Sequence, residues 1–259
     1  MARRMAALVI VALGPAAVCA QGFDWEYSAR FPGYASSLYA GIGASVASDG
    51  HTTDLTILEA ARAGYPEVVC TAFEKGSGTS FRMHAAAEYW AASSMSFTLR
   101  AGYAQRSSVF SGLSPKALMF DGSFLQTSYE LSTDIHAVNV EPAIKMRVPG
   151  RHVWACVGLR AEVSVSSRSQ LVESVTEPSG YVFPGTTSRQ RILSERDRVG
   201  LRGYALDTFV AIGLDVDAGT DRYVSPAFVV GLPLLSRSDR ASWTSVSLGL
   251  QVAYFFAMR

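Results

Sequence analysis

Eight separate segments of the chain alternate between apolar residues and small or polar residues. The last segment shows the pattern most clearly. Every second residue from Val246 to Tyr254 is aliphatic or aromatic, whereas the residues between them are serine, glycine, glutamine and alanine. A period of two places successive side chains on opposite faces of a β-strand. The pattern therefore predicts an all-β chain in which each strand has one apolar face.

The predicted strands are unusually long. Strands of globular proteins mostly have about 5–6 residues, whereas a strand that crosses a bilayer at a tilt needs about 9–11 residues. Each alternating segment here has about 11–15 residues, so its length favours a membrane. The eight predicted strands are residues 37–48, 80–91, 95–106, 134–148, 152–166, 203–217, 222–235 and 245–256.

The connections between these segments are sorted by length. With eight strands, every short turn falls at one end of the sheet and every longer loop at the other, which is the layout of an outer-membrane barrel. A soluble β-sandwich has no physical reason to sort its loops in this way. The short turns are residues 92–94, 149–151 and 218–221, and the loops are residues 49–79, 107–133, 167–202 and the shorter 236–241.

The N-terminus has the features of a secretory signal peptide. Arg3 and Arg4 precede an apolar run at residues 5–13, which is too short to span a bilayer. Small residues before the bond that follows Ala20 predict cleavage there. The predicted organisation is a signal peptide at 1–20, a periplasmic lead-in at 21–36, an eight-stranded barrel at 37–256 and a short tail at 257–259.

Composition excludes some partners. Loss of Arg3 and Arg4 with the signal peptide changes the formal net charge from +1 to −1, so nothing suggests nucleic acid as a partner. No later stretch has the roughly 20 uninterrupted apolar residues of a transmembrane helix. An exported chain with 49% hydrophobic residues is therefore a secreted β protein or a β-barrel. Cys70 and Cys156 fall at opposite ends of the predicted barrel, so we expect no disulfide.

If the apolar residues of each strand face lipid, the residues that alternate with them face the inside of the barrel. Many of these inward residues are charged. An unpaired buried ion is very costly, and an eight-stranded barrel has room inside for side chains or one small ligand. The near balance of acidic and basic residues therefore predicts a packed lumen rather than a constitutive pore. We expect no catalytic, metal or cofactor site, because no triad or metal-ligand spacing stands out. The predicted lumen charge network is Arg82, His84, Glu88, Arg100, Glu141, Lys145, Arg160, Glu162, Asp207 and Asp215.

In strand count, pattern and last strand, the chain resembles the OmpA-like family of eight-stranded outer-membrane barrels (outer membrane protein beta-barrel domain) over residues 37–256. Last strands in that family commonly carry a polar residue, a glycine and alternating hydrophobic residues that end in an aromatic, and the assembly machinery reads this signal. The departure is the tail at 257–259, and we expect no peptidoglycan-binding domain after the barrel. The positions that match the assembly signal are Ser247, Gly249, Val252, Tyr254 and Phe256.

The resemblance implies a monomer in the bacterial outer membrane with both barrel termini in the periplasm. It implies a role in membrane integrity, envelope anchoring or surface contact through the long loops, and we expect no enzymatic activity. The implied partners are membrane lipid, lipopolysaccharide and, during biogenesis, the barrel-assembly machinery. An arginine-rich stretch of the third long loop could contact lipopolysaccharide phosphates or could simply be solvated. Its arginines are Arg168, Arg189, Arg191, Arg196, Arg198 and Arg202.

Two other functions stay open on the sequence. The barrel could bind or pass a small hydrophobic molecule, in the manner of a porin or a lipid-handling protein. Pro142 and Pro226 mark places where strand pairing could loosen, because proline has no amide donor for the ladder. An outer-membrane enzyme acting on lipids would need a nucleophile and a base at the lipid-facing rim, and the sequence does not indicate such a pair.

Overall fold

The computed structural model describes residues 37–55, 73–119, 122–148, 151–196, 201–219, 221–239 and 241–258. The predicted signal peptide and lead-in lie outside the described residues. Within them, the strands are β1 Leu38–Thr53, β2 Lys75–Ala92, β3 Met95–Leu113, β4 Ala117–Leu118, β5 Phe124–Arg147, β6 Val153–Glu177, β7 Gln190–Arg196, β8 Tyr204–Leu214, β9 Val216–Asp217, β10 Arg222–Pro233 and β11 Trp243–Ala257.

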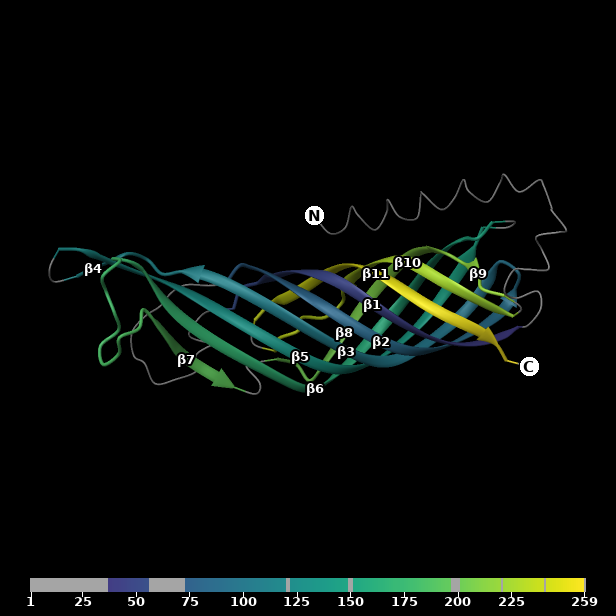
Figure 1. Cartoon of the computed structure of the whole chain (residues 1–259), viewed down its shortest axis with the longest axis horizontal. Coiled ribbons are helices and arrows are strands. Elements are labelled where there is room, and N and C mark those ends of the chain that lie inside the picture. Colours follow the sequence, from purple (N-terminus) through teal and green to yellow (C-terminus); the bar gives the residue numbers. More distant parts are fainter. Residues whose placement is uncertain are drawn as a thin grey trace.

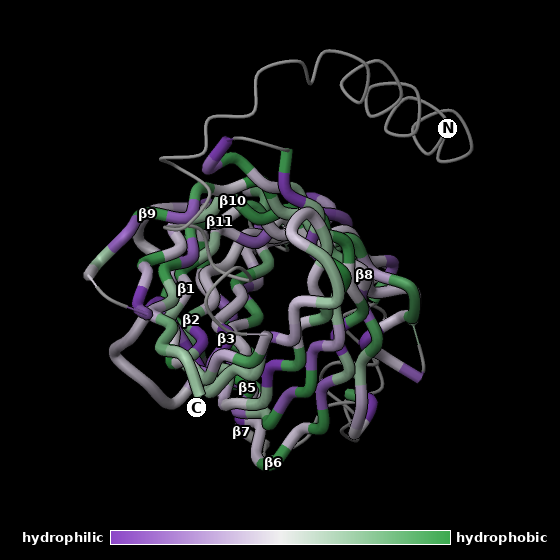
Figure 2. The backbone as a smooth tube through the Cα atoms, turned by 90° about the vertical axis from the view of Figure 1, so that its right-hand side faces the viewer, coloured by the Kyte–Doolittle hydropathy of each residue, from purple (hydrophilic) through white to green (hydrophobic). Residues whose placement is uncertain are grey.

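Eight of these strands close into a barrel. The order around the ring is β1, β2, β3, β5, β6, β8, β10 and β11, and the pairing of β11 with β1 returns to the start. Every neighbouring pair is antiparallel. Figure 2 looks along the barrel and shows the ring of strands. The prediction of an eight-stranded antiparallel up-and-down barrel is confirmed.

The two ends of the barrel differ. At one end, which we call the turn end, β2 is joined to β3 by only two residues, and the amide of Met258 donates to the carbonyl of Leu38. Gly219 and Asp221 both have positive φ in the turn before β10, a conformation that glycine and aspartate tolerate best. At the other end, the loop end, β4 and β7 flank long extensions of β5 and β6 (Figure 1).

Along the apolar band, the outward positions of the barrel strands carry large apolar side chains. Ile42 is 66% exposed and Leu250 is 62% exposed, whereas Arg160 on the inner face is 2% exposed. A soluble barrel would have the opposite arrangement, because burial of apolar area drives its folding. The outer wall is therefore a surface for lipid.

The apolar band has the height of a bilayer core. On β1 it runs from Leu38 to Val46, and on β5 it runs from Val138 to Met146. Nine residues extend about 30 Å along a strand, and a tilt of about 40° reduces this to about 23 Å, close to the ~25 Å band of membrane barrels. Within the described part of the chain, no helix is long and apolar enough to cross a membrane.

Several strands, above all β3, β5 and β6, continue beyond the predicted boundaries, whereas β8 and β10 end before them. Residues 107–133 and 167–202 were expected to be loops, but β5 and β6 stay paired as far as Gln126 and Glu177. A bulge between β5 and β6 makes even-numbered residues of β6 face inward up to Ser164 and odd-numbered residues from Ser167 onward. This change of parity, together with the polar composition above the band, hid the extension from a search for strict alternation.

Pro142 and Pro226 each interrupt a ladder. The β5–β6 pairing lacks partners at Glu141 and Pro142, although the register on either side is the same. Opposite Pro226, the strand that pairs with β10 is divided into β8 and β9. The predicted strand at 203–217 is therefore broken at Asp215, because proline provides no amide donor.

An arginine in the apolar band should destabilise the barrel strongly. We expect Ile42→Arg to lower the free energy of unfolding in lipid vesicles by about 2–4 kcal/mol, the usual cost near the bilayer midplane. Thr52→Arg, on the same strand and face but beyond the band, should cost at most about 1 kcal/mol. Urea unfolding of both refolded variants measures the difference, and equal costs would contradict the assigned band.

Candidate functional site

The inner face of the barrel carries a dense set of buried charges. All ten residues of the predicted network are on this face and at most 7% exposed. The structure adds Asp49, Arg106, Arg147 and Arg237, which are equally buried. Apart from His84, these lumen residues are seven basic and six acidic side chains, with a formal net charge of +1. The ion pairs form three levels along the barrel axis.

The level near the turn end centres on Lys145. Its Nζ lies 3.3 Å from Glu88 Oε1 and 2.9 Å from Asp215 Oδ1, and Arg147 pairs with the other oxygen of Asp215 at 2.8 Å. The Tyr223 hydroxyl donates to Glu88 at 2.8 Å. Lys145 also lies over the ring of Trp154, with Nζ 4.8 Å from the ring centroid. Aromatic rings and carboxylates together replace the water that this ammonium group loses on burial.

The middle level is a carboxylate between two arginines. Glu141 accepts a 2.5 Å hydrogen bond from Arg160 Nε and lies 3.7 Å from Arg100 Nη1. Asn139 also donates to Glu141, at 2.8 Å. The ring of Phe209 lies beside both guanidinium groups, at 5.7 Å from Arg100 and 5.2 Å from Arg160. Charge and packing therefore fill the centre of the lumen together.

The third level, toward the loop end, joins residues from five strands and a loop. Arg106 lies 2.7 Å from Glu162, 3.4 Å from Asp207 and 3.6 Å from Asp49. Arg237 lies 2.7 Å from Asp207 and 3.3 Å from Glu162. Arg82 adds a 3.7 Å contact to Glu162. Glu162 therefore serves three arginines.

His84 differs from the other predicted network residues. It forms no ion pair among the described residues, and its Nε2 has no hydrogen-bond partner there. Its ring packs where a side chain on Gly43 would otherwise be, 2.5 Å from the ideal Cβ position. The structure therefore places His84 as a packed side chain beside the network.

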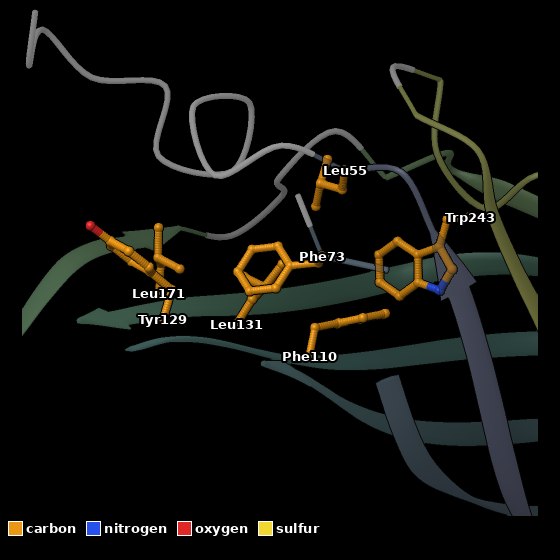
Figure 3. Packing of buried hydrophobic residues seen from close by; sticks show 7 residues of the cluster. All are labelled: Leu55, Phe73, Phe110, Tyr129, Leu131, Leu171 and Trp243. Carbon is orange, nitrogen blue, oxygen red and sulfur yellow. The ribbon is translucent and has the colours of Figure 1, made fainter. Parts of the chain in front are cut away.

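An apolar cluster, which we call the cap, packs toward the loop end of the barrel, and Figure 3 shows its seven buried side chains. The rings of Phe110 and Trp243 meet edge to face with centroids 5.0 Å apart. The Trp243 indole donates to His51 Nδ1 at 3.3 Å, which joins the cap to the level below. Such a layer excludes water from the charges beneath it. The cap consists of Leu55, Phe73, Phe110, Tyr129, Leu131, Leu171 and Trp243.

Above the band, Glu173 ties the extended strands together. Tyr129 donates to it at 2.8 Å, and Arg191 on β7 donates to its other oxygen at 2.6 Å. Burial raises the pKa of the Tyr129 hydroxyl to about 12, and the hydrogen bond to Glu173 acts in the same direction. The tyrosine therefore stays protonated and remains a donor at neutral pH.

The arginine-rich stretch does not form a bare positive surface. Arg191 pairs with Glu173, Arg168 with Glu195, and Arg202 with Asp239. Arg189 donates to the carbonyl of Val175 at 2.9 Å. Because these arginines already have acceptors, the stretch gives little support for phosphate binding. Arg198 lies outside the described residues, as does most of the first loop.

The proposed assembly-signal residues are divided between the two faces of β11. Ser247 and Gly249 face the lumen, whereas Val252 and Phe256 are exposed on the outer wall and Tyr254 is half-buried there. Cys156 is a buried free thiol on the inner face, and Cys70 lies outside the described residues. In the part of the chain that is described, no group of three or more His, Cys, Asp or Glu could hold a metal ion.

The four charged residues that the structure adds to the network differ in whether the sequence pattern could have predicted them. Arg106 and Arg147 follow the inward parity of their strands, so the alternation itself could have added them to the network. Asp49 lies in a segment that was expected to be loop, and it is in β1. Arg237 comes from the loop between β10 and β11, where its amide donates to the carbonyl of Trp243. No periodicity signals a loop side chain that turns back into the lumen.

No protein-family model matches the chain, and no curated protein matches it. Among solved structures, it is similar to neisserial surface protein A (NspA), with 11% identity, a TM-score of 0.36 and coverage of 84% of this chain and 96% of that one. It is also similar to Ail, the attachment invasion locus protein of Yersinia pestis, with 10% identity, a TM-score of 0.32 and coverage of 84% and 98%. The outer membrane protease OmpT of Escherichia coli matches at 8% identity and a TM-score of 0.32, with coverage of 85% and 96%. Sequence identities and TM-scores this low do not support a functional conclusion. The assignment of a barrel therefore rests on the strand pairing of this chain.

Loss of the Glu162 carboxylate should leave three arginines without their shared partner. Breaking a buried ion pair costs about 3–5 kcal/mol, so we expect Glu162→Gln to lower the free energy of unfolding by about that amount. Glu130→Gln removes an exposed carboxylate from β5 and should change stability by less than about 0.5 kcal/mol. Urea unfolding in detergent micelles compares the two variants. A Glu162→Gln protein as stable as the parent would show that this network contributes little.

Proposed function

We propose that the protein is an integral protein of the bacterial outer membrane, with a closed lumen and a role in envelope integrity or surface contact. The observation that carries this proposal is the combination of a lipid-facing wall with a paired, buried charge network inside it. A wall of this kind belongs in a bilayer. A lumen crossed by ion pairs at three levels and covered by an apolar cap favours a structural role over a constitutive channel.

The loop end is the part that we propose to face the outside of the cell. Residues 124–137 of β5 continue beyond the apolar band, which corresponds to about 45 Å of strand. Large apolar side chains are exposed on the strands paired with this projection, with Leu118 of β4 at 70% and Leu113 of β3 at 59%. Exposed apolar groups on a protein surface are typical of interaction sites. This placement puts both ends of the barrel chain in the periplasm.

The proposed partners are outer-leaflet lipid, including lipopolysaccharide, and the barrel-assembly machinery, which would read the last strand. We propose a monomer without enzymatic activity. The alternative, a barrel that binds or passes a small hydrophobic molecule, draws support from the ladder gaps at Pro142 and Pro226. The charges packed inside the wall at both places count against it, because a hydrophobic passenger would have to displace Glu141 or Asp215 from their ion pairs.

Surface labelling tests the proposed orientation. In a Cys70→Ser background, we expect Leu118→Cys at the loop end to react with a membrane-impermeant maleimide on intact cells. Arg222→Cys, which is exposed at the turn end, should react only after lysis. Recovery of the protein in the soluble periplasmic fraction, or labelling of Arg222→Cys on intact cells, would contradict this proposal.

Planar-bilayer recording tests the closed lumen. We expect no large steady conductance from the refolded protein, because ion pairs occupy the lumen at three levels. Replacing Arg106, Glu162 and Arg237 together by alanine should raise the frequency of openings, provided that the variant still shows heat-modifiable migration on a gel. Steady large conductance from the parent protein would instead support the transport alternative.

A further inference from the structure

Two hollows lie on the outer wall of the barrel, on the same group of strands. The larger has a volume of about 700 Å³ and is lined mainly by outward residues of β10, β11, β1, β2 and β3, together with the inward positions Ala47, Ser80 and Gly249. The smaller has a volume of about 590 Å³ and lies closer to the turn end on β11, β1, β2 and β3. Their floors include Ala47, Gly249 and Gly43. The inner-face residue His84, which packs beside Gly43, also borders the smaller hollow, whereas none of the ion-paired lumen residues borders either hollow.

Strand register explains the larger hollow. One wall is a row of side chains in ladder register across β10, β11, β1 and β2, which are Phe228, Leu250, Val46 and Phe81. The opposite wall is the next outward row, which runs through Leu248, Ser48, Thr79 and Ser107. In the smaller hollow, Ala44 and Ala85 are the short outward residues between Ile42, Met83 and Tyr254. The hollows therefore come from short side chains placed between long ones.

The two hollows follow each other along β1 from Ser48 to Ile42. Six residues of strand extend about 20 Å. One leaflet of a hydrocarbon core about 30 Å thick requires about the same length of strand at a tilt of about 40°. Together the two hollows form a groove. The groove begins where the outward residues change from apolar to polar and ends near the middle of the apolar band. An acyl chain in one leaflet of a bilayer covers the same depth.

The polar end of the groove is lined by uncharged polar side chains. Its lining residues are the uncharged Ser48, Thr79, Gln105 and Ser107, and the hydroxyl groups of Thr79 and Ser107 lie 3.0 Å apart. The charges that continue this row are Asp134, which is opposite Ser107, and Arg168, which is paired with Glu195. Together these three carry a formal charge of −1, which disfavours an anionic group. Hydroxyl and amide groups instead suit the hydroxyl groups of a sugar.

We propose that this groove binds the acyl chain of one membrane lipid that has an uncharged, hydroxyl-bearing headgroup. The chain lies along β1 against Val46, Leu250 and Ala44, and the headgroup lies against Thr79, Gln105 and Ser107. The proposal rests on the membrane placement proposed above, with the loop end in the outer leaflet. It predicts a preference among lipids, which a merely lipid-facing wall does not have.

Native mass spectrometry of the refolded full chain tests the site. The protein is mixed in detergent with equal amounts of monogalactosyl diacylglycerol and dioleoyl phosphatidylglycerol. We expect one retained glycolipid, favoured over the phosphatidylglycerol by about fivefold, the discrimination that one hydrogen bond to a headgroup supplies. Ser48→Trp fills the groove and should reduce glycolipid retention by about fivefold or more. Ser166→Trp, an exposed residue of β6 outside the groove, should leave it unchanged.

A second variant separates the headgroup from the chain. Thr79→Val keeps the shape of the groove and removes one hydroxyl, so it should keep lipid retention and lose the preference for the glycolipid. Equal retention by the parent and Ser48→Trp proteins would overturn the proposal, as would a preference for phosphatidylglycerol. A dimer that retains no lipid would assign the groove to a second copy and overturn it as well. If the parent protein instead shows no heat-modifiable migration, the membrane placement itself fails.

Discussion

Backbone hydrogen bonding in a medium without water is the constraint on which the rest of this structure depends. A strand in lipid must pair on both edges, because an unpaired amide or carbonyl group costs several kcal/mol there. The pairings of β1 with β11 and of β5 with β6 meet this requirement by closing the ring. Once the ring is closed, the alternation of each strand divides the side chains between lipid and lumen. The two ladder gaps occur where prolines have no amide to offer.

Closure with eight strands also decides what the interior can hold. The lumen has room for side chains and little else, so charges inside it must find partners within the protein. Lys145, Glu141 and Glu162 each join at least two oppositely charged residues, and aromatic rings fill the space beside them. Removing one member of such a group leaves the others buried without compensation. The same network that supports the wall thus also blocks a solute path.

The outer wall and the loop end carry the surfaces that remain available for function. The groove along β1 arises from short outward residues beside long ones, and its polar end coincides with the edge of the apolar band. The extensions of β5 and β6, tied together through Glu173, carry exposed apolar residues far beyond this edge. The functions that we propose for this protein therefore depend on lipids or partners that contact the outer wall and the loop end. They do not depend on a solute that passes through the lumen.

The sequence by itself determined the fold class, the number of barrel strands and the face on which most charges lie, because a period of two is a local property that each strand carries alone. Val140 and Glu141 could be placed on opposite faces without knowing any neighbour. Only the tertiary structure decided which charges meet, since Arg106, Asp49 and Asp207 come together through register between distant strands. It also decided that Arg237 enters the lumen from a loop and that β6 changes parity at a bulge, since both depend on contacts that no local period encodes.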